Sequence, residues 1–437
     1  MNKKLLAVAV AGALAAPGVA LAQASSVTIS GFFKVGYEQQ TLSGSPSTVT
    51  SGRLNSSQVR IVDNSSRLIF NVNEALGNGL EAVAQLDIRF APDQAASIQT
   101  ANGLGTGNTW VGLKSAKWGR VTMGRHDLHY GSSPDDTAAK AGALEAANIS
   151  LFDYINQTAI ANGTRTQNVL RYDTPTWNGF DGTVAWSASP VGGSELDQIN
   201  VSPTTTGNAQ AVTATPIPGT VALGAAGATS PILGPGGTAT RKGDGWNAKF
   251  QYTNGPFQIG YSYWNAKPDA PGPATNDQLG NTVWGYYKWG GFKVGLGWNE
   301  SELKNSNGFI YSTTPGAGTV TSSAAAATNS STAAKRQAWT LPMSYVWGPH
   351  NIVGHYTQAN NNTALVNSSN SGAKMYAMAY VYDMSKRTSL GLTYAKINNG
   401  SNASYNFFTG SALGSLDTVL VGGESPRLLQ ATIKHAF

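Results

Sequence analysis

The feature that most constrains this chain is a regular alternation of short turns with long polar connections. Seven turns can be identified, each flanked by runs of about ten residues in which apolar and polar side chains alternate. The turns are at Leu76–Gly79, Lys117–Gly119, Trp177–Gly179, Thr253–Pro256, Trp289–Gly291, Trp347–Pro349 and Asp383–Lys386. Seven turns join fourteen strands in pairs, and a first and a last strand complete sixteen if both chain ends lie on the turn side.

The long connections between these pairs are rich in polar and small residues. They are expected at 41–58, 92–107, 126–164, 188–244, 266–280, 301–337, 359–372 and 398–426. Short turns on one side and long loops on the other are the layout of a membrane barrel, with its turns in the periplasm and its loops outside. A closed barrel of this size encloses an aqueous channel. The sequence therefore predicts an all-β fold, a 16-stranded antiparallel transmembrane β-barrel.

The last strand shows most clearly which way the side chains face. Leu429, Ala431, Ile433, His435 and Phe437 share one parity, and the residues between them are mainly polar. A period of two with one apolar face is the pattern of a half-buried strand. In a membrane barrel the apolar parity faces lipid and the polar parity faces the water of the lumen.

The N-terminus has the pattern of an export signal. Lys3 and Lys4 precede an apolar run that ends at Ala20-Leu21-Ala22, a small-x-small cleavage site. The run is too short to span a bilayer as a helix. We therefore expect a signal peptide at 1–22 and one barrel domain at 23–437, and losing the two lysines lowers the net charge from +6 to +4. The chain contains no cysteine.

Nucleic-acid binding and enzymatic activity are not expected. The basic excess is modest, and the arginines fall on predicted strands instead of along one helix, so no nucleic-acid partner is predicted. His126 and His129 flank Asp127 in an H-x-x-H pattern that could bind a metal, but no further ligand is in register. The phosphate-binding G-x-x-x-x-G-K-[ST] motif is absent, and no serine, histidine and acid can be selected as a triad. No cofactor is expected.

Several segments, in this order and spacing, resemble the general-diffusion porins of the Gram-negative outer membrane, especially the β-proteobacterial branch. They are Ser26–Gly31, Ser66–Phe70, Gly79–Leu86, Val111–Lys114, Gly119–Arg125, Asn168–Asp173, Ser385–Thr388 and Lys434–Phe437. The resemblance implies a sixteen-stranded barrel, usually a homotrimer of separate pores. It also implies a third loop that folds into each lumen and narrows it.

The resemblance also implies a set of constriction residues. Three wall arginines of the family map by position to Arg67, Arg125 and Arg165. They face acids of the third loop, for which the candidates here are Asp135, Asp136, Glu145 and Asp153. This loop lacks the Pro-Glu-Phe-Gly motif common in the family, so no single acid can be assigned. Beside the resemblance, strand parity adds Arg89 and Arg171 to the basic wall, and Lys34 stands where many relatives have an acid.

These residues predict passive diffusion of ions and small hydrophilic solutes, with anions preferred because the narrow zone is basic. Expected partners are outer-membrane lipid and lipopolysaccharide, and the barrel-assembly machinery, which reads a terminal aromatic such as Phe437. Pairing of the arginines with Glu81, Asp87 and loop acids would leave little selectivity. A substrate-selective channel and a nonconducting adhesive or structural barrel remain alternatives.

Overall fold

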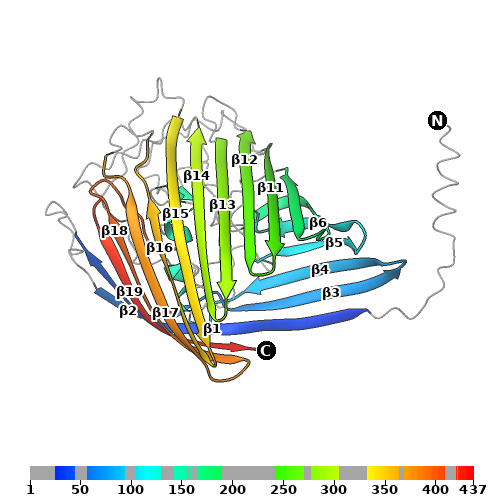
Figure 1. The fold of residues 1–437 in the computed structure, drawn as a ribbon, viewed down its shortest axis with the longest axis horizontal. Coiled ribbons are helices and arrows are strands. Elements are labelled where there is room, and N and C mark those ends of the chain that lie inside the picture. The colour runs from blue at the N-terminus through cyan, green and yellow to red at the C-terminus, as the bar shows by residue number, and fades with distance from the viewer. Residues whose placement is uncertain are drawn as a thin grey trace, which may run out of the picture.

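The protein is almost entirely β-structure (Figure 1). The computed structural model describes residues 25–44, 57–93, 105, 107–128, 142–152, 154–155, 158–159, 165–188, 242–269, 277–304, 332–363, 369–408, 420 and 422–437. The expected signal peptide lies outside these residues. The wall strands are β1 (Ser26–Ser43), β2 (Ser57–Asp63), β3 (Arg67–Gly77), β4 (Leu80–Arg89), β5 (Thr109–Ser115), β6 (Gly119–His126), β9 (Thr166–Asp173), β10 (Phe180–Ser187), β11 (Lys242–Asn254), β12 (Phe257–Asp269), β13 (Asp277–Trp289), β14 (Phe292–Lys304), β15 (Thr332–Trp347), β16 (His350–Ala359), β17 (Ala373–Asp383), β18 (Thr388–Asn399) and β19 (Ser425–Ala436).

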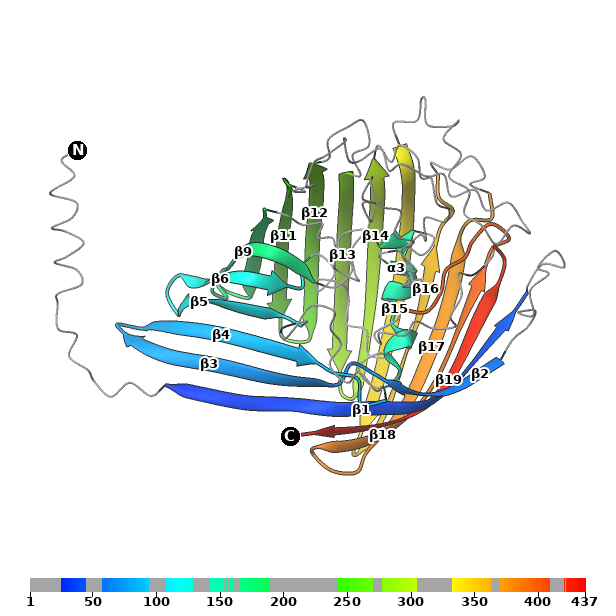
Figure 2. The ribbon, with the colours of Figure 1, turned by 180° about the vertical axis from the view of Figure 1, so that it is seen from behind.

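These seventeen strands form one antiparallel sheet that closes on itself, because β1 pairs with β19. β2 and β3 both pair with β1, so they are two halves of one interrupted strand. The barrel therefore has sixteen strands, and Figures 1 and 2 show them wrapping around one interior. The predicted fold class is confirmed.

All seven predicted turns are present, and the residues at two of them explain their geometry. Asn78 and Gly79 have φ of 52° and 75°, and Asn178 and Gly179 have φ of 49° and 87°. Positive φ at both central residues defines the type I′ hairpin, whose twist matches that of the strands. Both chain ends lie on the turn side, since β1 begins and β19 ends beside turns.

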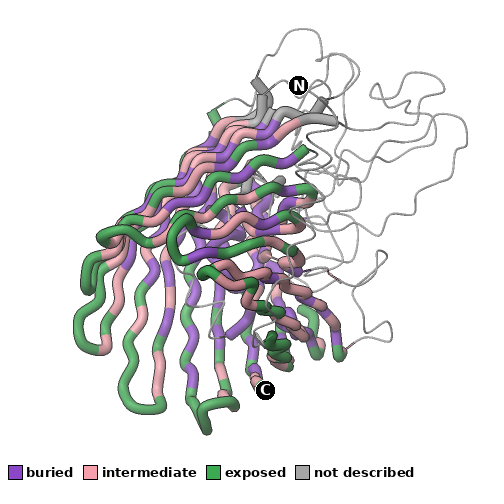
Figure 3. Tube along the Cα trace, turned by 90° about the vertical axis from the view of Figure 1, so that its right-hand side faces the viewer, coloured by how far each residue is buried: buried purple, intermediate pink, exposed green. Residues whose placement is uncertain are grey.

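Side chains alternate across the wall as the sequence predicts. In β17, Lys374, Tyr376 and Met378 are exposed on the outside, whereas Met375 and Ala377 are buried on the inside. Figure 3 shows the same alternation of exposed and buried positions along the strands. The exposed apolar face is the surface that a bilayer covers.

The third loop lies inside the barrel where it is described. It carries η2 (Leu144–Ala146), α3 (Ile149–Phe152) and the small hairpin of β7 (Tyr154–Ile155) and β8 (Thr158–Ala159). Figure 2 shows α3 within the curve of the sheet, and α3 contacts β15, β16 and β17. Small inward residues such as Ala377 and Ala379 make room for it in one buried cluster. No helix among the described segments is long and apolar enough to cross a membrane.

Candidate functional site

The candidate site begins at the bend that separates β2 from β3. The Asp63 carboxylate accepts hydrogen bonds from the amides of Ser65 at 2.8 Å and Ser66 at 2.9 Å. Ser65 has a φ of 69°, and the Asn64 amide returns to the Lys34 carbonyl at 2.8 Å. This local capping lets the chain leave the ladder and rejoin it. The bend places the Ser65 side chain beside two arginines of the wall.

Arg67 is the first of these arginines. Its Nε donates to the Ser65 carbonyl at 3.3 Å and its Nη2 donates to the Ser65 hydroxyl at 3.0 Å. The guanidinium also lies over the Phe32 ring, 4.9 Å from its centroid. Arg67 makes no ion pair with any residue in the described ranges, so within them its charge is not neutralised by contact with a carboxylate.

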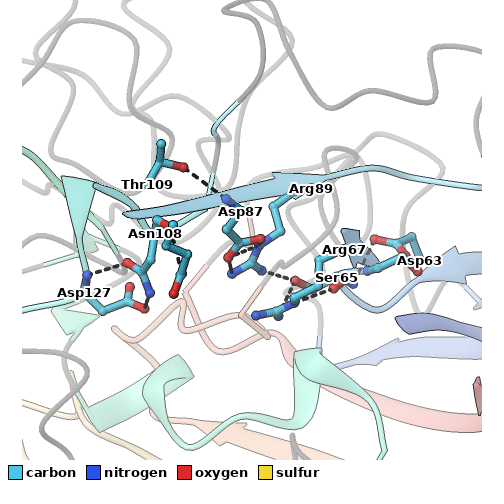
Figure 4. A network of polar contacts seen from close by, with 10 residues as sticks. Asp63, Ser65, Arg67, Asp87, Arg89, Asn108, Thr109 and Asp127 are labelled. Atoms are coloured by element: carbon cyan, nitrogen blue, oxygen red, sulfur yellow. Dashed lines mark hydrogen bonds and ion pairs between the residues drawn. The ribbon is translucent and has the colours of Figure 1, made fainter. Parts of the chain in front are cut away.

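Arg89 lies directly opposite Arg67 in the ladder between β3 and β4, but its charge is compensated. It pairs with Asp87 on its own strand, with Nε at 3.0 Å from Oδ1 and Nη2 at 3.0 Å from Oδ2. Its Nη1 also donates to the Ser65 hydroxyl, so one serine contacts both guanidinium groups (Figure 4). The buried pair is of the bidentate, charge-assisted kind that holds an arginine in one orientation.

Arg165, at the end of the third loop, adds a further positive charge to this wall. It is half-buried and close enough to repel both Arg67 and Arg89. The Asp127 carboxylate partly offsets this repulsion, and Asn108 holds it through a hydrogen bond of 2.6 Å. The structure thus brings Arg67, Arg89 and Arg165 together, and Figure 4 shows Asp127 and Asn108 in the same network.

Arg125 sits at an irregularity of the sheet. The pairing of β6 with β9 shifts between Gly124 and His126, and Gly124 has a φ of 146°. Simple alternation therefore does not fix the direction of the half-buried Arg125 side chain. This is the physical reason why parity alone could not place it.

Arg171 belongs to a neighbouring ion-pair group on β6 and β9. Its Nη2 lies 2.7 Å from Oδ1 of Asp173, whose other oxygen lies 2.8 Å from Nη2 of Arg120. Arg171 also donates to the Asp127 carbonyl at 3.2 Å, which links this group to the arginine wall. Two arginines share one carboxylate here, so the group carries an excess of positive charge.

The described acid of the third loop, Glu145, lies near a different part of the wall. It is fully buried, and the charged groups that act on it most strongly are Glu38, Arg60 and Lys34. Glu38 is itself buried, with Oε1 at 2.8 Å from Arg60 and Oε2 at 2.6 Å from the Gln430 amide. The other candidate acids, Asp135, Asp136 and Asp153, fall outside the described residues.

Arg336 on β15 anchors the third loop and was not singled out from the sequence. Its Nη2 donates to the Phe152 carbonyl at 2.5 Å and its Nη1 to the Leu151 carbonyl. These carbonyls end α3, where a cation is favoured by unsatisfied acceptors. On β16, His355 Nε2 lies 2.8 Å from the Ala146 carbonyl. The sequence signal that could have identified Arg336 and His355 is their inward position in the alternation of β15 and β16.

One histidine of the H-x-x-H pattern that could bind a metal is described, and it packs against neighbouring wall residues. His126 is buried, stacks on Trp110 with centroids 5.8 Å apart, and lies 3.2 Å from the Thr122 hydroxyl. His129 is outside the described residues. The ranges that the structure covers contain no group of three or more metal-ligating side chains.

Comparison with known proteins places this architecture in a family. A family model described as Gram-negative porin matches residues 7–402. An outer membrane porin protein of Bordetella pertussis is 31% identical over 224 residues, which is 49% of this chain and 55% of that protein. The major outer membrane protein P.IB of Neisseria gonorrhoeae is 30% identical over 206 residues, which is 46% of this chain and 52% of that protein. The chain spans about half the length of the curated relatives it matches.

Solved structures share the fold at low sequence identity. An anion-selective porin from Comamonas acidovorans has a TM-score of 0.62 at 19% identity, covering 95% of this chain and all of that one. OmpF of Salmonella typhi has a TM-score of 0.57 at 14% identity, covering 94% of this chain and 97% of that one. The fold agrees with the family match, which extends over most of the sequence. The chain belongs to the Gram-negative porins, proteins of the outer membrane.

Proposed function

We propose that this chain forms a water-filled channel for passive diffusion of ions and small hydrophilic solutes, and that the channel prefers anions. The narrow zone lies where the third loop faces the wall that carries Arg67, Arg89, Arg125 and Arg165. Lys34 and Arg171 extend the basic surface to either side. The active form is a homotrimer with one pore in each protomer.

The observation that supports the anion preference is that carboxylates neutralise the wall arginines unequally. Asp87 neutralises Arg89 through the bidentate pair, whereas Arg67 bonds only to Ser65 among the described residues. Arg165 adds positive charge at short range. Low-dielectric walls focus the electric field of the charges in a narrow passage, so an excess of charge of one sign concentrates counter-ions there. The Comamonas neighbour, which is itself described as anion-selective, motivates the same test here.

The proposed partners follow from the surface and the ends of the barrel. The exposed apolar band contacts outer-membrane lipid, and lipopolysaccharide forms the outer leaflet around the loops. Phe437 at the end of the last strand is the aromatic that the barrel-assembly machinery binds. A neighbour solved in a trimer form, OmpT of Vibrio cholerae, with a TM-score of 0.55 at 10% identity, agrees with trimeric assembly of this fold.

Conductance across a planar bilayer tests this function. Purified, folded protein is added to one side, and the reversal potential is measured in a potassium chloride gradient. We expect stable conductance steps, grouped in threes because a trimer inserts as a unit, and a potential that favours chloride. A cation-favouring potential would overturn the anion preference and keep the pore. A folded barrel without conductance would instead favour the adhesive or structural alternative.

A further inference from the structure

Phe32 is an apolar ring on the inner wall that two cations contact. The guanidinium of Arg67 lies 4.9 Å from the ring centroid, and the ammonium of Lys434 lies 4.8 Å from it. Phe32 is in register with Arg67 on β3, and β1 also pairs with β19, which carries Lys434. An aromatic face attracts a cation and favours its position beside the ring. We call these three residues the Phe32 group.

The Phe32 group faces the lumen. Arg67 belongs to the arginine wall, Phe32 is in register with it, and Lys434 is in register with the inward Lys34. All three side chains of the group are half-buried, so each keeps part of its surface open to the lumen. Lys434 is close to the chain end, which lies beside the turns. The group therefore extends from the arginine wall toward the turn side of the channel.

Neither cation of the group is neutralised by contact with a carboxylate. Arg67 and Lys434 form no ion pair with the residues that the structure describes, and Arg67 is close enough to repel Lys434. The Asp383 carboxylate offsets part of the charge of Lys434 from a distance. Like charges that lie close together repel each other, so an anion that contacts both cations is attracted twice and relieves their repulsion.

A second ring of the inner wall also contacts two cations, but its surroundings differ. Lys288 and Lys293 lie 5.0 Å and 4.3 Å from the centroid of the Tyr286 ring. The inward residues in register with this set on β12 and β15 are neutral, namely Gln258 and Ser344. The Phe32 group instead adjoins the arginine wall, whose charges add to its own. It therefore attracts anions more strongly than the set around Tyr286 does.

We propose that the Phe32 group binds short aliphatic dicarboxylates as they pass through the channel. One carboxylate contacts the guanidinium of Arg67, the other contacts the ammonium of Lys434, and the methylene groups between them pack against the ring. Two cations that share an apolar ring match two anionic ends joined by an apolar chain, and the first contact raises the effective concentration for the second. This inference rests on the channel function proposed above and names a class of solute for it.

The test measures block of the chloride current through the folded full-length protein in a planar bilayer. The probes are succinate and succinamate, which has the same chain but carries an amide in place of one carboxylate. Each probe is added to both sides at constant ionic strength. We expect succinate to half-block the current at a concentration at least about fivefold lower than succinamate does, because only succinate contacts both cations. In Lys434→Gln this ratio should fall below about twofold, and Lys434→Arg should restore it.

The matched control combines Lys288→Gln with Lys293→Gln and should keep the ratio of the unaltered protein. An equal ratio in Lys434→Gln and the unaltered protein would overturn the inference, and so would a ratio lost only in the control, which would place the site at Tyr286. A chloride preference without any difference between the two probes would overturn this inference and leave the proposed function standing. Absence of a chloride preference in the unaltered protein would contradict the proposed function itself. Heat-dependent gel migration confirms that each variant is folded.

Discussion

Glu145 carries a carboxyl group that is buried inside the barrel and has no hydrogen-bond partner for either oxygen within the described residues. Loss of hydration raises the pKa of this carboxyl to about 8, and the nearby carboxylate of Glu38 contributes to the rise. Arg60 and Lys34 act in the opposite direction but do not cancel the effect. At neutral pH the buried acid is therefore mainly protonated.

The raised pKa predicts that docking of the third loop weakens at alkaline pH. Below the ordinary pKa of a glutamate, the acid is neutral whether the loop is docked or released, so docking has its full stability. Between the ordinary pKa of 4.5 and the raised pKa of about 8, the released acid ionises while the docked acid stays neutral, so this stabilisation is progressively lost and is gone once pH exceeds about 8. Open-channel current noise should therefore increase as pH rises across this window and level off above it. Glu145→Gln should remove that pH dependence, and equal pH dependence in both proteins would contradict the assignment.

The wall arginines show which properties of single residues can be predicted from the sequence: the direction of the side chain can be predicted, but its contacts cannot. The inward direction of Arg67 and Arg89 followed from a period of two, and the structure places both inside the barrel. The cross-strand position of Arg67 against Arg89, and the serine that contacts both, depend on the bend between β2 and β3. That bend arises from local capping by Asp63, which no periodicity reveals.

At the scale of elements, the third loop is attached to the wall mainly through polar contacts to its backbone. Besides Arg336 and His355, the Thr393 hydroxyl accepts the Ala143 amide at 3.2 Å. Buried backbone groups require such partners because they cannot bond to water. The resemblance implied that the third loop folds into the lumen, but these individual contacts were not predicted, because alternation marks inward side chains without showing which loop carbonyl or amide each one meets.

Replacing Arg336 with methionine tests the attachment. The variant Arg336→Met keeps a long side chain but removes the donors to the α3 carbonyls, so the loop should dock more weakly by about 2 to 3 kcal/mol. We expect noisier single-channel currents and faster proteolytic cleavage within residues 142–152. Lys335→Met changes the adjacent outward residue and should leave both readouts unchanged. Identical noise and cleavage in Arg336→Met and the unaltered protein would refute the anchoring role.

At the scale of the whole molecule, the turns and the alternation were sufficient to predict a closed barrel. A transmembrane sheet must satisfy every backbone group internally, so sixteen strands with both ends on one side have to close. Lys34 and Glu38 face inward although both are charged, because the lumen is polar and the bilayer is outside. The strand boundaries were less predictable: β15 begins at Thr332, inside the connection expected at 301–337.

We propose that uncompensated arginine charge on one side of the lumen sets the ion preference of the whole channel. The most direct measurement is the reversal potential in a potassium chloride gradient for two variants that remove opposite charges. Arg67→Gln should lower the chloride-to-potassium permeability ratio by roughly two- to threefold, and Asp87→Asn should raise it by a similar factor. Lys335→Gln, on the outer face, should leave it unchanged. Shifts in the same direction for both variants, or no shift for either, would contradict the claim.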